Sequence, residues 1–123
     1  MLFRSYKNME IIYNSLVLLH FIGLASLFGG FLVQMSAAAK VINPAMFHGS
    51  LTQLVTGILL VGLAESGVVD EDLNMGKITV KLIMVLIITG IVFANKKKSS
   101  VSTAIWASVG LLTFVNMAVA VYI

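Results

Sequence analysis

The chain has 123 residues, of which 59% are hydrophobic and only 11% are charged, and its mean hydropathy is +1.04. A soluble domain carries about 25% charged residues, so these side chains are too few to cover a water-facing surface. The net charge of +3 comes mainly from Lys96, Lys97 and Lys98. This short cluster is typical of a loop that faces anionic lipid headgroups, and it does not indicate nucleic-acid binding. The absence of cysteine excludes disulfides and thiolate metal sites.

Four long segments are almost free of charge. Asp, Glu, Lys and Arg are absent from 11–39, 41–64 and 99–123, and 78–95 contains only Lys81. Crossing the ~30 Å hydrocarbon core takes about 20 helical residues, so each segment has roughly the length of a membrane span. Stretches such as 82–88 are apolar on every side, which favours helices over the alternating strands of a membrane barrel. The sequence therefore predicts an all-α, polytopic membrane four-helix bundle, with 1–123 as a single domain.

The first helix is expected over about 9–39. Arg4 and Lys7 precede it as in a signal peptide, but the apolar run exceeds the 7–15 residues of a signal core, so we expect it to be retained.

The second helix is expected over 44–65, because Asn43 is a good N-cap and Pro44 suits the first helical position. The short connection predicts that these two helices are antiparallel neighbours.

The third helix is expected over about 75–95 and the fourth over about 102–122. Between the second and third helices, 66–74 forms an acidic loop with Gly67 as a stop signal. The acidic residues of this loop are Asp70, Glu71 and Asp72.

The distribution of basic residues predicts the orientation in the cell membrane. Four crossings place both termini and the acidic loop on one face. The opposite face carries Lys40 and 96–98, four cations, whereas the terminal face carries Arg4, Lys7 and Lys77. The positive-inside rule therefore favours a cytoplasmic lysine loop and two outside termini.

Small and polar residues recur along one side of three helices, as they do where membrane helices pack together. The second helix carries His48, Gly49, Thr52, Gln53, Thr56 and Gly57 at helical spacing. The first carries His20, Gly23, Gly30 and Gln34, with the small pairs Ala25/Gly29 and Ser26/Gly30, and the fourth carries Thr113, Asn116 and Ala120. These stripes join the helices either within one bundle or between the chains of an oligomer.

Three helices place a polar side chain at a similar depth from the terminal face. We estimate about 8–10 Å for His20, about 7 Å for Lys81 and about 9 Å for Asn116. Intramembrane ionisable groups are candidates for function, although Lys81 can also extend to the interface and His20 can also be a neutral imidazole bonded to a neighbouring helix. His48 should lie on the order of 15 Å deeper than His20, so the two cannot ligate one haem iron.

Part of the sequence resembles known membrane families. The segments 19–23 and 28–30, in which a His is followed some ten residues later by Gly, are similar to the first helix of copper-resistance D-type proteins and of bacterial haem-associated protoporphyrinogen oxidases. The segment 78–82 resembles the lysine-bearing helix of these oxidases. This resemblance implies that His20 is the axial ligand of a haem b iron and that Lys81 is its functional partner. Phe28 stands where the families usually have Trp.

A second resemblance covers the second helix. The segments 43–49 and 51–57 are similar to small four-helix membrane proteins of actinobacterial type, a group with no assigned activity. This resemblance implies the same four-helix membrane architecture.

Three functions follow from these observations. The first is a non-enzymatic membrane subunit or scaffold that packs against lipid or partner helices, as a homo-oligomer or with a partner subunit. It is favoured because the spans contain no carboxylate, no nucleophile–base pattern and no phosphate loop. The second is a haem- or quinone-linked redox protein that uses His20 and Lys81. The third, a proton-coupled multidrug transporter, is disfavoured because Glu10 and Glu65 lie only at helix edges.

Overall fold

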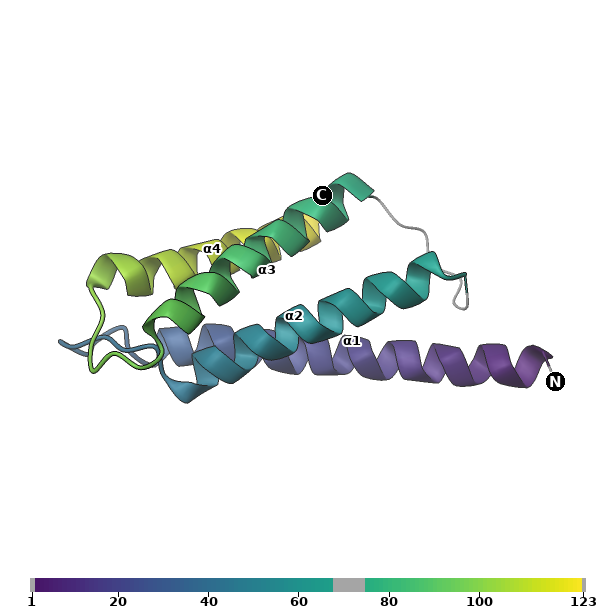
Figure 1. Ribbon diagram of the computed structural model, residues 1–123, viewed down its shortest axis with the longest axis horizontal. Helices are drawn as coiled ribbons and strands as arrows, with labels where there is room; N and C mark the ends of the chain where they lie inside the picture. The colour runs from purple at the N-terminus through teal and green to yellow at the C-terminus, as the bar shows by residue number, and fades with distance from the viewer. Residues whose placement is uncertain (1, 68–74, 123) are drawn as a thin grey trace.

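The fold is a bundle of helices, each of which packs against two neighbours (Figure 1). The computed structural model describes residues 2–67 and 75–122, which form α1 (Leu2–Leu32), α2 (Pro44–Glu65), α3 (Met75–Asn95) and α4 (Thr103–Tyr122). The order of contacts is α1, α2, α3, α4 and back to α1. All four helices are long and apolar enough to cross a membrane. The prediction of an all-α, polytopic four-helix membrane protein is confirmed.

Local capping sets the bounds of α2 as predicted. Asn43 has extended backbone angles (φ −79°, ψ 167°), and its side chain accepts a hydrogen bond from the Met46 amide at 2.9 Å. Pro44 follows as the first helical residue. At the other end, Gly67 adopts a φ of +79°, which favours glycine and stops the helix. The helix bounds 44–65 and 75–95 are confirmed, whereas Asp70, Glu71 and Asp72 of the predicted acidic loop lie outside the described residues.

The expected end of the first helix is wrong. We expected it at Ala39, but α1 ends at Leu32 and a series of turns and bends follows. The Lys40 ammonium group donates to the backbone oxygens of Gln34 at 2.5 Å, Met35 at 3.2 Å and Ala37 at 2.5 Å. These carbonyls belong to the turns that follow α1, so the ammonium group holds this segment in its non-helical path. In the last turn of the helix, the Gly30 carbonyl accepts from the Gln34 and Asn43 side chains instead.

The start of α1 also differs from the expected position. The helix begins at Leu2 instead of about 9 and contains 31 residues, so it is about 46 Å long. This length exceeds the ~30 Å of a hydrocarbon core. The candidate membrane span covers Asn8–Leu32, so the first turns of α1 lie outside it.

Lys40 also joins the two loops at the end of the bundle opposite the termini, which we call the loop end. Its backbone oxygen accepts a hydrogen bond from the Val101 amide at 2.8 Å, in an isolated antiparallel bridge. Its ammonium lies 4.4 Å from the centre of the Trp106 ring, and the side chain is only 7% exposed. Lys40 is thus buried in protein, although the sequence predicts it among the cations that face headgroups.

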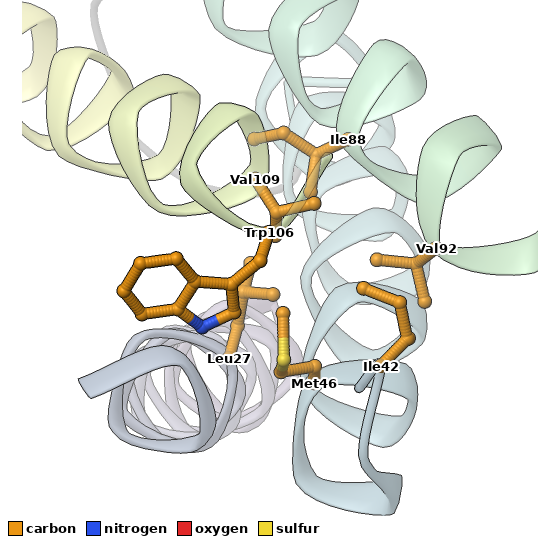
Figure 2. Close-up of a cluster of buried hydrophobic side chains, with 7 residues drawn as sticks. All are labelled: Leu27, Ile42, Met46, Ile88, Val92, Trp106 and Val109. Carbon is orange, nitrogen blue, oxygen red and sulfur yellow. The ribbon is translucent and has the colours of Figure 1, made fainter. Parts of the chain in front are cut away.

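The main apolar core lies near the loop end and draws on all four helices (Figure 2). Its buried members are Leu27, Ile42, Met46, Ile88, Val92, Trp106 and Val109. Beside it, the Phe31 ring stacks on Trp106 with centroids 4.4 Å apart, and the indole nitrogen donates to the Phe31 carbonyl at 3.2 Å. Gly110 admits this phenyl ring, because a Cβ at Gly110 would overlap it. Figure 1 shows α3 and α4 inclined to α1, so the bundle opens toward the termini.

Helices α1 and α2 approach each other most closely where both carry glycine. A Cβ at Gly49 would lie 2.7 Å from the Gly23 oxygen and 2.8 Å from the Leu27 Cα, and a Cβ at Gly23 would lie 2.9 Å from the Thr52 side chain. Such distances leave no room for a larger residue, so the two backbones touch. The structure therefore uses this part of the predicted stripes within the chain.

Candidate functional site

The predicted polar layer is consistent with the observed helix bounds. Measured along each helix from the loop end, the depth is about 18 Å for His20 on α1, about 21 Å for Lys81 on α3 and about 20 Å for Asn116 on α4. Thr56 on α2 lies at about 18 Å on the same scale. Each helix therefore contributes a polar side chain at a similar level of the bundle.

The His20 ring is held by a hydroxyl of α2. Its Nδ1 lies 2.7 Å from Thr56 Oγ1, and this hydroxyl donates its own hydrogen to the Thr52 carbonyl at 2.5 Å. A hydroxyl has a single hydrogen, so in the bond to His20 the Thr56 oxygen accepts and Nδ1 donates. The geometry therefore assigns the proton of a neutral imidazole to Nδ1 and leaves a lone pair on Nε2.

The backbone of His20 is also bound by α2. The Gln53 side-chain amide donates to the His20 carbonyl, and Gln53 is only 2% exposed. The His20 Cε1 lies 3.5 Å from the position of a Cβ on Gly57, so a small residue there admits the ring. Among the residues that the structure describes, Nε2 has no hydrogen-bond partner. His20 is thus a well-oriented imidazole with one nitrogen available to a ligand.

The other two predicted members reach this level from the opposite hairpin. Lys81 on α3 is half-buried at a similar depth to His20. Asn116 is 8% exposed, and its buried Oδ1 accepts no hydrogen bond from any described residue. A buried acceptor without a donor costs about 1–3 kcal/mol, so Asn116 favours a ligand or water that supplies a donor.

His48 does not belong to this layer. It lies about 6 Å from the loop end along α2, some 12 Å from the level of His20. The side chain is exposed, and its ring packs against Phe47 at 5.1 Å. The predicted stripe of α2 therefore does not include His48, which faces outward. Its buried members include Gly49, Gln53 and Thr56.

Two features of the structure were not found from the sequence. The first is the role of Thr56, for which the sequence predicts only packing. Thr56 lies four residues after Thr52, so its hydroxyl can donate to the Thr52 carbonyl and its oxygen then accepts from His20. The burial of Lys40 was missed because its partners are backbone carbonyls, which no residue pattern identifies.

At this level of the bundle, His20 has a nitrogen lone pair and Asn116 has a buried carbonyl oxygen. Over the described residues, no group of three or more His, Cys, Asp or Glu side chains could hold a metal ion by itself. An imidazole nitrogen with a lone pair is a suitable axial ligand for haem iron. Comparison of the chain with protein-family models, curated proteins and solved structures finds no match.

Proposed function

We propose that this small polytopic membrane protein is a non-enzymatic subunit or scaffold that pairs with a second copy of itself through the outer face of α1. The observation that carries this proposal is the state of Gly29: no atom lies within 4 Å of the position of a Cβ there. Ala25, one turn earlier, is exposed. Of the two small pairs in α1, Ser26/Gly30 contacts α2, and Ala25/Gly29 remains open to another helix.

The neighbouring pair shows how such residues are used within the chain. Ser26 Oγ donates to the Ala45 carbonyl at 2.7 Å, and a Cβ on Gly30 would lie 2.9 Å from Met46 Cγ. Two small residues one turn apart let a second helix approach closely, and Ala25 and Gly29 leave such a surface open on α1. Copies inserted with one orientation pair about an axis normal to the membrane, which places Gly29 against its equivalent.

Cysteine cross-linking in native membranes tests this contact, because the natural chain contains no cysteine. Ala25→Cys should give an oxidised dimer. Leu111→Cys is the control, since Leu111 is 64% exposed on α4 at a similar depth and should give none. A product with the mass of another protein would assign a partner subunit to this face. No product from Ala25→Cys would contradict the proposal.

A specific observation also favours the second candidate, a haem- or quinone-linked redox protein. Histidines that bind metals commonly donate their other ring nitrogen to the protein, and His20 does so to Thr56 at 2.7 Å. Lys81 on α3 lies at a similar depth in the bundle. The resemblance of 19–23 and 78–82 to haem-associated oxidases supports the same pair, with His20 as ligand of haem b and Lys81 as second ligand or propionate partner.

An absorbance spectrum of the detergent-solubilised protein, as isolated and after dithionite reduction, tests this candidate. A Soret band is expected, and His20→Ala should abolish it while His48→Ala should retain it. His48 is the matched control because it is exposed and lies at another level of the bundle. A protein without a Soret band, even after addition of haem, would exclude haem binding.

A further inference from the structure

A groove of about 520 Å³ lies between α3 and α4 near the loop end. This volume is within the ~300–1,000 Å³ typical of small-molecule sites. Small residues open it: Gly90 and Ala94 line it from α3, and Ala104 and Ser108 line it from α4. Their spacing of four places each pair on one side of its helix. The remaining surface is mostly that of isoleucines, so the groove is apolar along most of its length.

The end of the groove nearest the loop is polar. Asn95 lines it there, is only 6% exposed and donates through Nδ2 to the Ile91 carbonyl at 2.7 Å. This bond assigns the other side-chain atom as Oδ1, which is buried and has no donor among the described residues. Because protein atoms cover this oxygen, Asn95 closes the head of the groove without offering the oxygen to a ligand there.

Three lysines follow Asn95 directly in the chain, and the first of them turns toward Phe47 of α2. Lys96 lies over the rings of Phe47 and Phe93, 4.4 and 5.0 Å from their centres. Lys97 and Lys98 are exposed beside it. The loop then leads into the first turn of α4 at Thr103, where free amide groups and the helix dipole also favour an anion.

We propose that this groove holds an acyl chain of one anionic phospholipid, for which phosphatidylglycerol is the probe. The phosphate lies near Lys97, Lys98 and the start of α4, and an acyl chain lies along the groove. From Asn95 to Ile87 the groove runs about 12 Å along α3, from the headgroup level into the hydrocarbon. A partner helix would fill the apolar part but would leave the exposed Lys97 and Lys98 without anionic partners. The site is separate from the α1 face and does not depend on the proposed dimer.

Native mass spectrometry of the full-length protein tests this site. The protein is reconstituted with equal amounts of phosphatidylglycerol and phosphatidylcholine, and the lipid that stays bound after transfer to detergent is identified. We expect one phosphatidylglycerol per chain, preferred over phosphatidylcholine. The double variant Lys97→Gln/Lys98→Gln should weaken retention roughly thirtyfold, about fivefold for each lysine. Lys96→Gln should have a smaller effect, because Lys96 is held by aromatic rings.

Two glycine variants separate the groove from general effects of a larger side chain. Gly90 and Gly62 both have open space where a Cβ would lie, but only Gly90 lines the groove. Gly90→Leu should abolish lipid retention, whereas Gly62→Leu should leave it unchanged. Equal retention of both lipids, or retention by Gly90→Leu, would overturn the proposal. Ala94→Cys tests the rival occupant: an oxidised dimer from this position would show that a second chain fills the groove, while Ala25→Cys reports independently on the α1 face.

Discussion

The two hairpins of the molecule are joined in different ways. Between α1 and α2, glycine brings the backbones into contact, and side chains of both helices form hydrogen bonds across the interface. Between 82–95 of α3 and 103–116 of α4, no side-chain hydrogen bond crosses. The Thr113 hydroxyl donates to the Val109 carbonyl of its own helix at 2.7 Å, and the Thr89 hydroxyl is buried without a partner.

This difference matters because lipid does not drive membrane helices together. Association relies on close packing of small residues and on hydrogen bonds between helices. The α1–α2 pair uses both, so it should be the more stable and better defined hairpin. The α3–α4 pair directs small residues into a groove instead, and therefore keeps a surface that a ligand can occupy.

The largest expected effect is the difference in stability between two glycine replacements, one in each hairpin. Gly49→Leu places a side chain against the α1 backbone, where a Cβ alone would lie 2.7 Å from the Gly23 oxygen. We expect a loss of about 3 kcal/mol or more in the free energy of unfolding, because the helices must separate. Gly90→Leu should cost little, since the space around Gly90 is open. Reversible unfolding in mixed detergent micelles, followed by circular dichroism, measures both. Equal losses would show that the hairpins are packed alike.

A smaller effect is expected at Lys40, which connects the two hairpins. Lys40→Met removes three hydrogen bonds to carbonyls and the contact with Trp106. Buried carbonyls without donors should lower the free energy of unfolding by about 2–3 kcal/mol. Lys97→Met is the matched control, because Lys97 is exposed in the other loop and should change stability by less than about 0.5 kcal/mol. A similar result for both lysines would mean that the Lys40 contacts contribute nothing to stability.

Much of the architecture could be predicted from the sequence, because membrane spans and helix caps have local signals. The apolar runs predict the four helices, and Asn43-Pro44 and Gly67 predict both ends of α2. The level of His20, Lys81 and Asn116 follows from counting residues along the helices. The end of α1 could not be predicted in this way, since 35–39 suits a helix and the side chains that bind the last carbonyls of α1 come from distant positions such as Asn43 and Trp106.

The functional role of His20, Lys81 and Asn116 stays a prediction. The depth of these residues follows from residue counting, whereas the His20 tautomer depends on where the Thr56 hydroxyl donates its single hydrogen, which the Thr52 carbonyl accepts. The groove was missed for a related reason. The spacing of four in Gly90/Ala94 and in Ala104/Ser108 can be seen in the sequence. Only the structure shows that these residues line a groove instead of packing against each other.

The smallest expected effect concerns the hydrogen bond between His20 and Thr56. Thr56→Val keeps the shape of the side chain but removes the acceptor, and should cost about 0.6–1 kcal/mol in the same unfolding measurement. Thr113→Val, in the other hairpin, removes only a bond within α4 and should cost less. A larger loss for Thr113→Val would reverse the assigned roles of the hairpins.

The same variant tests the tautomer directly. In the natural protein, nitrogen NMR of labelled histidine should show the His20 proton on Nδ1, because the Thr56 oxygen accepts it at 2.7 Å. Thr56→Val leaves Nδ1–H without this acceptor, so the population with the proton on Nε2 should rise. His48 provides an internal reference, since it is exposed and should give the same signal in both proteins. If the His20 proton lay on Nε2 in the natural protein, that nitrogen would have no lone pair to offer, and the redox candidate would lose the observation on which it rests.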